Sequence, residues 1–335
     1  MGQRMLRVAI VGADSLAGRD LLESLYDDSF PMEEPRLFTL GEEEETLSLE
    51  EEDLRVRPLE PGALKGQDLI FVLPGARLEA AQVEEATAGG GIVLDASAER
   101  SEAPLVFPGL NDEELDEHPD ARHYALPTPL AAQLATVLLP LEAKVRVRSV
   151  EAVALLPAAG AGVDGIDELS RQTIDLLSGR EPPRKVFGHR LAFNLVPLVG
   201  RMGEAGQTDE EVGTLEQAGR LLGRAIPGHL VATWVPLFHG STLFVTVRTE
   251  RPLDREAVRA AYKEEKGIAV LDDPEQQVVP MPMLAVGDAR MHVGRFLPVG
   301  ESLHLVSVAD ALRFGVAAPL VELARELFRR GRFSG

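Results

Sequence analysis

Residues 7–18, RVAIVGADSLAG, indicate the class of fold that this chain adopts. The first six residues of this stretch form a short, mostly apolar run that ends at Gly12, which predicts a buried strand followed by a tight turn. The segment from Ser15 to Leu25 then has the spacing of an amphipathic helix. A buried strand, a glycine turn and a helix in immediate succession form the opening unit of a parallel sheet with crossover helices.

The same alternation continues through the first part of the sequence. Short apolar strands are expected at 36–40, 68–73 and 92–95, with a turn at Pro74-Gly75 and a helix from Ala76 to Ala88. The glutamate runs at 42–45 and 50–52 are expected to be solvated loops or faces. Short strands alternating with helices predict an α/β fold with a doubly wound parallel sheet.

The second half of the chain has a different pattern. Residues 145–156 and 229–249 are longer alternating stretches rich in valine and threonine, which favours a mostly antiparallel sheet. Helices are expected at 165–177 and 208–223. A further helix is expected from Asp310 to Arg330, with Pro319 inside it.

Composition excludes several classes of function. A length of 335 residues predicts two domains, and a formal net charge of −20 argues against nucleic acid and anionic membrane as partners. No run is apolar enough to span a membrane, and the start lacks the features of a signal peptide, so we expect a cytoplasmic protein. The sequence has no cysteine, which rules out disulfides, thiolate metal sites and thiol chemistry. The histidines show no metal-ligand spacing, so no metal site is expected.

The turn after the first strand is the candidate nucleotide site. Gly12 supplies the tight turn, and Gly18 allows the helix to pack closely on the strand. Ser15 stands where a glycine would let the backbone approach a pyrophosphate. These three residues are the cofactor-binding candidates, and Asp14 is expected to cap the helix. Because glutamates follow the second strand, NADP binding is not expected, whereas weak NAD binding is left open.

Several motifs recur in a fixed order along the chain: the glycine turn at 12–18, DASAER at 95–100, VFPGLN at 106–111, AGAG at 159–162, LAFNLVP at 191–197 and VGR at 293–295. Together they resemble the aspartate-semialdehyde dehydrogenase family, and most of all its cysteine-less Usg-type paralogues. The resemblance implies a Rossmann-type domain over 5–128 with 310–335, and a mixed α/β dimerisation domain over 129–309 with a long, largely antiparallel sheet. It also implies a homodimer.

The residues that the family uses for catalysis are replaced in this chain. The resemblance places the family's cysteine nucleophile at Pro129, which is expected to be the first residue of a helix after Thr128. Arg100 and Glu211 remain at positions that match the family. They are the candidates for what remains of its substrate- or anion-binding site. The other replaced positions are Leu156 for the family's glutamine, Trp234 for its substrate-binding arginine, Ser241 for its histidine and Gly213 for its lysine.

These replacements predict that the family reaction is lost, because it needs both a nucleophile and a base. His239 is interpreted as a structural histidine, although it lies two residues before Ser241. The leading hypothesis is a scaffold retained for binding or assembly, as a homodimer or as a heteromer with an active paralogue or another protein. Two alternatives stay open: a divergent NAD(P)-dependent oxidoreductase, and a metabolite sensor that uses Arg100 and Glu211.

Overall fold

The computed structural model describes residues 4–49, 52–97 and 102–333. The chain divides into two compact units: residues 1–128 together with 316–335, and residues 129–315. Each unit is built around its own sheet. Among the helices of the described ranges, none is long and apolar enough to cross a membrane.

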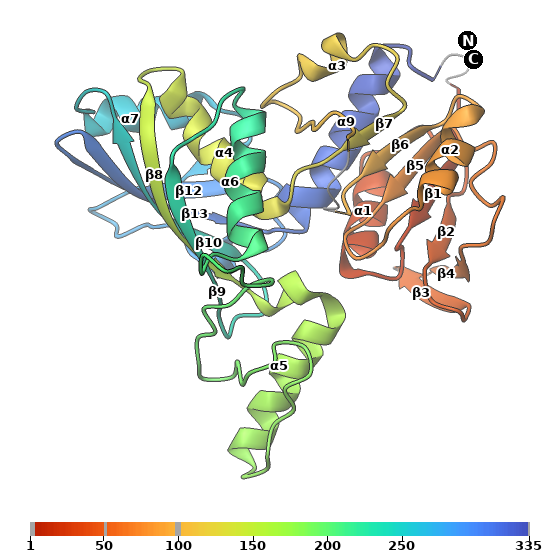
Figure 1. The fold of residues 1–335 in the computed structure, drawn as a ribbon, viewed down its shortest axis with the longest axis horizontal. Helices are drawn as coiled ribbons and strands as arrows, with labels where there is room; N and C mark the ends of the chain where they lie inside the picture. The colour runs from red at the N-terminus through yellow and green to blue at the C-terminus, as the bar shows by residue number, and fades with distance from the viewer. Residues whose placement is uncertain (1–3, 50–51, 98–101, 334–335) are drawn as a thin grey trace. The chain divides into compact units, whose positions relative to one another are not determined.

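The first unit contains a seven-stranded sheet in the order β3-β4-β2-β1-β5-β6-β7 (Figure 1). Neighbouring strands are parallel throughout except for β3 and β4. This order confirms the predicted Rossmann-type sheet. Its strands are β1 (Val8–Val11), β2 (Arg36–Thr39), β3 (Glu45–Leu49), β4 (Glu52–Pro58), β5 (Leu69–Val72), β6 (Ile92–Asp95) and β7 (His123–Ala125), and its helices are α1 (Leu16–Asp27), α2 (Ala80–Ala88), α3 (Glu114–Glu117) and α9 (Ala318–Arg329).

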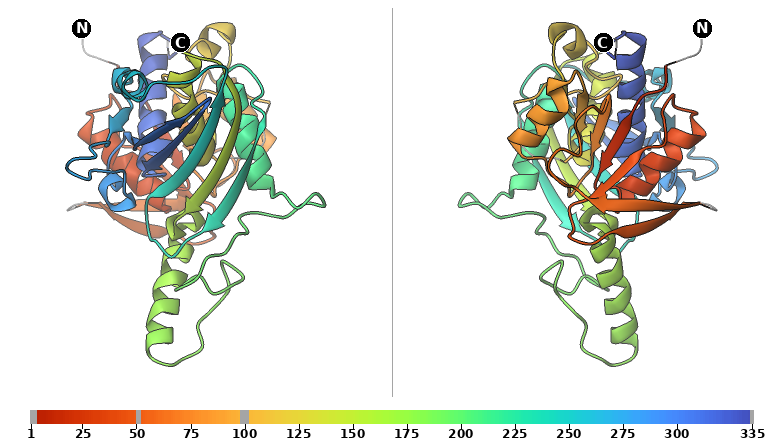
Figure 2. Two further views of the ribbon diagram at one scale, coloured as in Figure 1. Left: turned by 90° about the vertical axis from the view of Figure 1, so that its left-hand side faces the viewer. Right: turned by 90° about the vertical axis from the view of Figure 1, so that its right-hand side faces the viewer.

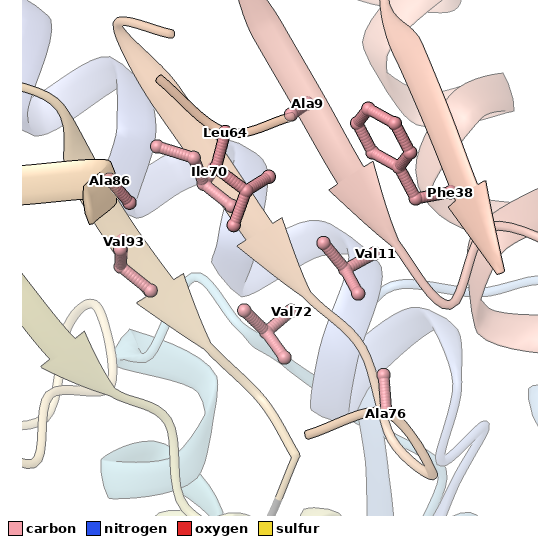
Figure 3. Packing of buried hydrophobic residues seen from close by; sticks show 9 residues of the cluster. All are labelled: Ala9, Val11, Phe38, Leu64, Ile70, Val72, Ala76, Ala86 and Val93. Atoms are coloured by element: carbon pink, nitrogen blue, oxygen red, sulfur yellow. The ribbon is translucent and has the colours of Figure 1, made fainter. Parts of the chain in front are cut away.

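One face of this sheet is closed by an apolar cluster that includes residues of β1, β2, β5, β6 and α2 (Figure 3). All members are buried, so the short apolar strands of the sequence are the centre of the core. The cluster comprises Ala9, Val11, Phe38, Leu64, Ile70, Val72, Ala76, Ala86 and Val93.

The glutamate-rich segment forms an antiparallel pair of strands, β3 and β4, that the sequence analysis does not predict. Leu47 and Leu49 alternate with polar residues along β3 and are buried, while Glu45 and Ser48 are exposed. Residues 46–49 of β3 therefore alternate between exposed and buried side chains, with a period of two.

The second unit contains a six-stranded sheet in the order β11-β12-β13-β10-β8-β9. Only β8/β9 and β11/β12 are parallel pairs, which confirms the largely antiparallel sheet. The strands are β8 (Val147–Leu156), β9 (Gly228–Trp234), β10 (Ser241–Thr249), β11 (Ile268–Val270), β12 (Met291–Val299) and β13 (Ser302–Ala309), and the helices are α4 (Pro129–Glu142), α5 (Gly162–Leu177), α6 (Asp209–Leu221), α7 (Arg255–Glu264) and α8 (Pro282–Ala285).

Helix α5 and the loop after it project away from the sheet of this unit (Figure 1). Two buried side chains of α5 hold the loop in place. Glu168 accepts hydrogen bonds from the Lys185 and Val186 amides at 2.6 and 2.8 Å. Gln172 accepts one from the Leu191 amide at 2.7 Å. The loop is therefore ordered by buried hydrogen bonds rather than by regular structure.

The C-terminal segment differs from the single helix predicted over 310–330. Residues Arg313–Ala317 form a short π-helical turn, and α9 begins only at Ala318. Pro319 lies in the first turn of α9, where its missing amide hydrogen breaks no hydrogen bond of the helix. The predicted start at Asp310 was wrong: the α-helix begins at Ala318, so Pro319 lies in its first turn and not in its middle.

Replacing Gly18 by alanine should lower the free energy of unfolding by about 1–3 kcal/mol. An added Cβ would lie 2.2 Å from the backbone oxygen of Ala13, so the turn and α1 would have to move apart. Gly213, in α6, is the matched control because its Cβ would meet nothing within 4 Å. Gly213→Ala should therefore raise stability by up to about 1 kcal/mol. Urea unfolding followed by circular dichroism tests both, and a Gly18→Ala variant as stable as the native chain would contradict this packing.

Candidate functional site

The start of α4 is occupied by the ring of Pro129. Pro129 is the first residue of the helix, as predicted, and it has no backbone N–H to offer an anion. The ring packs against Gly315 so closely that a Cβ added there would lie 2.5 Å from the Pro129 Cβ. This position therefore holds a packed hydrocarbon ring, and it can supply neither a nucleophile nor a hydrogen-bond donor.

One helical turn later, Gln133 fixes α4 to the sheet. The Ser241 hydroxyl donates to the Gln133 side-chain oxygen at 2.8 Å, and the Gln133 amide donates to the Ser307 hydroxyl at 3.0 Å. All three side chains are buried. The Ala309 carbonyl oxygen, 3.2 Å from the same hydroxyl, is the alternative acceptor for its single hydrogen. The residue at the predicted base position is thus part of a buried hydrogen-bond network that joins α4, β10 and β13.

Trp234 and Leu156 lie side by side at the ends of β9 and β8, where they are register partners. The indole contacts Gly160, where an added Cβ would lie 3.0 Å from the ring. It also meets the ring of Phe187 edge-on, with centroids 5.3 Å apart. The site of the predicted lost arginine is therefore filled by aromatic packing.

The four replaced catalytic positions lie together at one end of the second unit's sheet. They are Pro129, Leu156, Trp234 and Ser241. Leu156 and Trp234 are paired, and Ser241 begins the strand on the other side of β8. Pro129 lies one turn before Gln133, the hydrogen-bond partner of Ser241. None of the four side chains titrates near neutral pH, so the cluster cannot perform general acid–base chemistry.

His239 does not lie on the same strand as Ser241, so it is not placed beside this cluster by strand geometry. The following Gly240 has φ +85°, which ends the extended geometry between His239 and Ser241. Gly240 also packs on Pro282 of α8, where a Cβ would lie 2.7 Å from the proline Cβ. His239 is half-buried, so the interpretation of a structural histidine stays a prediction.

Glu211, predicted as part of an anion remnant, is buried and uses its carboxylate within the fold. It accepts hydrogen bonds from the amides of Thr208 and Ala232 at 2.9 and 3.0 Å. These bonds cap α6 and tie it to β9. Arg100, the other member of the predicted remnant, lies outside the described residues.

The neighbouring Glu210 was missed by the sequence analysis. Burial, together with the charge of Asp209, raises the pKa of the Glu210 carboxyl. Glu210 lies three residues before Gly213, where the family resemblance places a lysine, and there is open space at Gly213. Residues three apart on a helix are neighbours, so the spacing between Glu210 and Gly213 could have drawn attention to Glu210.

The glycine turn of the first unit has the backbone conformation of a nucleotide-binding turn, but several of its amides donate to oxygen atoms of the protein itself. Gly12 has φ +85°, and its amide and that of Ala13 donate to the Phe38 carbonyl oxygen at 2.8 and 3.1 Å. Ser15 is the N-cap of α1, because its hydroxyl accepts from the Gly18 amide at 3.1 Å. These donors are consequently engaged within the protein.

The expectation that Asp14 caps α1 was wrong. The Asp14 carboxylate instead accepts a hydrogen bond from the Thr39 hydroxyl at 2.8 Å, at the end of β2. Because Ser15 already caps the helix, Asp14 is left to join β2 to the glycine turn. Its negative charge therefore stands beside the turn at which a phosphate would bind.

Within the described ranges, one group of side chains has the spacing of metal ligands. Glu114, Glu117 and His118 place one potential ligand atom each within 4.8 Å of one another on or next to the short α3. The Glu114 and His118 side chains lie 3.4 Å apart at i,i+4 spacing, which is an ordinary surface pair on a helix. All three are exposed or half-buried, so this group does not add a site.

Comparison with known proteins covers both units. Two family models match: semialdehyde dehydrogenase, NAD binding domain, over residues 7–118, and semialdehyde dehydrogenase, dimerisation domain, over residues 138–314. An aspartate-semialdehyde dehydrogenase of Aquifex aeolicus is 29% identical over 97% of this chain and 98% of that protein. A USG-1 protein homolog of Pseudomonas aeruginosa is 30% identical over the same shares. The crystal structure of aspartate semialdehyde dehydrogenase II complexed with ASA from Vibrio cholerae gives a TM-score of 0.90 at 27% identity, covering 98% of this chain and 99% of that chain.

Replacing Gln133 by leucine should lower the free energy of unfolding by about 1–3 kcal/mol, because buried hydroxyls lose a partner. The side chain is fully buried and bonds to Ser241 and Ser307. The exposed Gln276 provides the control, and Gln276→Leu should change stability by less than about 0.5 kcal/mol. Thermal and urea unfolding measure the difference. Equal stability of the two variants would show that the network does not hold α4 in place.

Proposed function

Because the chain belongs to the semialdehyde dehydrogenase family, we propose that it has lost the family's phosphorylating dehydrogenase reaction and is retained as a binding or assembly scaffold. The observation that carries this proposal is the packed ring of Pro129, where the family resemblance places the reactive cysteine. Substitution of the nucleophile alone removes the covalent route, in which a thiolate attacks the aldehyde carbon.

The second requirement of the reaction, a base, is also unmet. The Ser241 hydroxyl lies where the family resemblance places the histidine, and it donates a hydrogen bond to the Gln133 side-chain oxygen. A serine hydroxyl cannot accept a proton at neutral pH as an imidazole does. Trp234 replaces the cation expected to bind the substrate carboxylate, and its ring packs on Gly160 and Phe187 instead. The residues for three separate roles are therefore all replaced: the nucleophile, the base and the cation for the substrate carboxylate.

A homodimer is part of this proposal. One face of the six-stranded sheet is free of helices of its own unit (Figure 2, left). Exposed apolar side chains on this face surround a hollow of about 530 Å³, and the unit matches a family dimerisation domain. The side chains are Val153, Val231, Phe244 and Leu297. Exposed apolar patches of this kind commonly mark protein interfaces.

A second candidate function uses the nucleotide turn. Gly12 and Gly18 keep the conformation and close packing that a dinucleotide-binding turn needs. The retained turn geometry supports weak NAD binding. It also supports the alternative functions of a divergent oxidoreductase or a metabolite sensor. NADP is not expected, because exposed glutamates follow β2 where a 2′-phosphate would require arginine. The internal hydrogen bonds of Glu211 count against its use in a sensor site.

Purified protein supplied with aspartate semialdehyde, phosphate and either NADP or NAD should form no reduced cofactor above the rate of a protein-free blank. The physical reason is the absence of a thiol nucleophile at Pro129 and of a base at Ser241. The Aquifex aeolicus relative, assayed in parallel, is the positive control. Turnover that scales with the concentration of this protein, after repeated purification, would refute the loss of activity.

The Phe244→Glu variant should be a monomer where the native chain is a dimer. Phe244 is 46% exposed at the centre of the free sheet face, so the new carboxylate would face its own symmetry mate. Leu40→Glu, at 49% exposure in the first unit, is the matched control and should remain a dimer. Sedimentation velocity distinguishes the two states. A native chain that is a monomer, or a Phe244→Glu chain that stays dimeric, would contradict the proposed interface.

A further inference from the structure

A polar hollow of about 920 Å³ lies over β2 and β4 of the first unit's sheet. Three arginines of these two strands line it, Arg36, Arg55 and Arg57, and we name it the arginine hollow. The turn at residues 12–18 is not part of its lining. The hollow is therefore distinct from the candidate nucleotide site.

The hollow exists because a crossover helix is missing from this part of the sheet. Parallel sheets are normally covered on both faces by the helices that connect their strands. The connection from β4 to β5, residues 59–68, consists of turns and contains no helix. Helix α2 contributes Ala86 to the apolar cluster on the same face as Phe38, but it packs on β6. The face above β2 and β4 is consequently left open.

Strand register places the three arginines on this open face. Arg57 is the register partner of Phe38, whose ring lies in the buried cluster of the sheet. Arg36 and Arg55 lie two residues before Phe38 and Arg57, and residues two apart on a strand share a face. All three arginines are exposed. The guanidinium groups therefore gather from neighbouring strands above a buried aromatic ring.

Two of these guanidinium groups have no partner in the protein. Arg55 lies 3.9 Å from the Glu44 carboxylate. The guanidinium groups of Arg36 and Arg57 have neither an ion pair nor a hydrogen bond within the described ranges. Like charges on adjacent strands destabilise a sheet. An anion bound between the arginines would offset this repulsion.

Carboxylates also line the hollow, and most lie at the ends of its strands. Glu34 precedes β2, Glu44 precedes β3 and Glu60 follows β4. Asp53, on β4, already accepts a hydrogen bond from the Ser48 hydroxyl at 2.7 Å. Carboxylates repel phosphate but accept hydrogen bonds from hydroxyl groups. The arrangement thus suits a ligand with phosphate at the arginines and hydroxyl groups toward the carboxylates.

The size of the hollow and the chemistry of arginine narrow the ligand further. Pockets for small organic molecules commonly have volumes of about 300–1,000 Å³, so this hollow has room for more than a single phosphate. The planar guanidinium group can form two parallel hydrogen bonds with phosphate oxygens. The chain's formal net charge of −20 repels anions at long range. Anion binding therefore needs such a local group of cations.

We infer that the arginine hollow binds a phosphorylated sugar or a similar hydroxyl-rich phosphate ester. Arg36 and Arg57 would bind phosphate oxygens, and the carboxylates at the ends of the strands would accept hydrogen bonds from the hydroxyl groups. This inference concerns the first unit alone, so it goes beyond the proposed scaffold role and does not depend on it.

The first test is calorimetric titration of the full-length protein with fructose 1,6-bisphosphate at physiological ionic strength. The titration should show saturable binding. Fructose lacks the phosphates and 1,6-hexanediol bisphosphate lacks the free hydroxyl groups, and each should bind at least about tenfold more weakly. Absence of saturable binding of the sugar bisphosphate would overturn the inference. Equal affinity for the hydroxyl-free bisphosphate would overturn it as well.

The second test locates the bound sugar bisphosphate. Arg36→Gln and Arg57→Gln should each weaken its binding by at least about tenfold, because each removes a charge-assisted hydrogen bond. Both variants should melt at a temperature no lower than the native chain, since they relieve repulsion between arginines. Arg220→Gln, at an exposed arginine of α6, is the matched control and should bind like the native chain.

Unchanged binding by the Arg36→Gln/Arg57→Gln double variant would place the ligand elsewhere, such as at the turn of Gly12, and would overturn the inference. The dehydrogenase assay and the sedimentation measurement do not involve these residues. The inference and the proposed function can therefore fail separately.

Discussion

The hydrogen bonds that Gln133 forms with Ser241 and Ser307 set the position of α4 in the region around Pro129. They join α4 to β10 and β13 in the buried interior of the second unit. A buried polar network of this kind is favourable only when its members find partners, so it fixes the position of α4 relative to the sheet. Pro129 is held one turn away, against Gly315. The start of α4 is thereby held against the sheet of the second unit by side chains that hydrogen-bond to one another.

In the turn at residues 12–18, the glycines have a structural role that does not depend on nucleotide binding. Gly12 and Gly18 are required by the local fold, one for its positive φ and the other for close contact with Ala13. Ser15 and Asp14 face no such requirement, and their side chains bond to Gly18 and Thr39. A chain can therefore keep the glycines of a dinucleotide-binding turn for packing alone. The same distinction explains Glu211, whose carboxylate caps α6 and bonds to β9.

The sequence predicts what depends on local pattern. The strand before Gly12, the helix start at Pro129 and the alternation in β8 and β10 follow from periodicity and from proline and glycine geometry. The β3–β4 pair was missed because glutamates mask the alternating Leu47 and Leu49. That Asp14 bonds to Thr39 instead of capping α1, and that Glu211 bonds to the Ala232 amide of β9, depends on contacts between segments far apart in the sequence. Spacing alone cannot supply that information.

We propose that this chain keeps the fold of the semialdehyde dehydrogenase family and acts through its surfaces. Calorimetric titration of the folded protein with NADP, and separately with NAD, tests this role. We expect heats equal to dilution for NADP, and for NAD at most weak binding with a Kd on the order of 1 mM or above, a binding free energy of only about −4 kcal/mol. Saturable binding of either nucleotide with a Kd on the order of 1 μM would refute the proposal, because it would show that the turn at Gly12 still serves a cofactor.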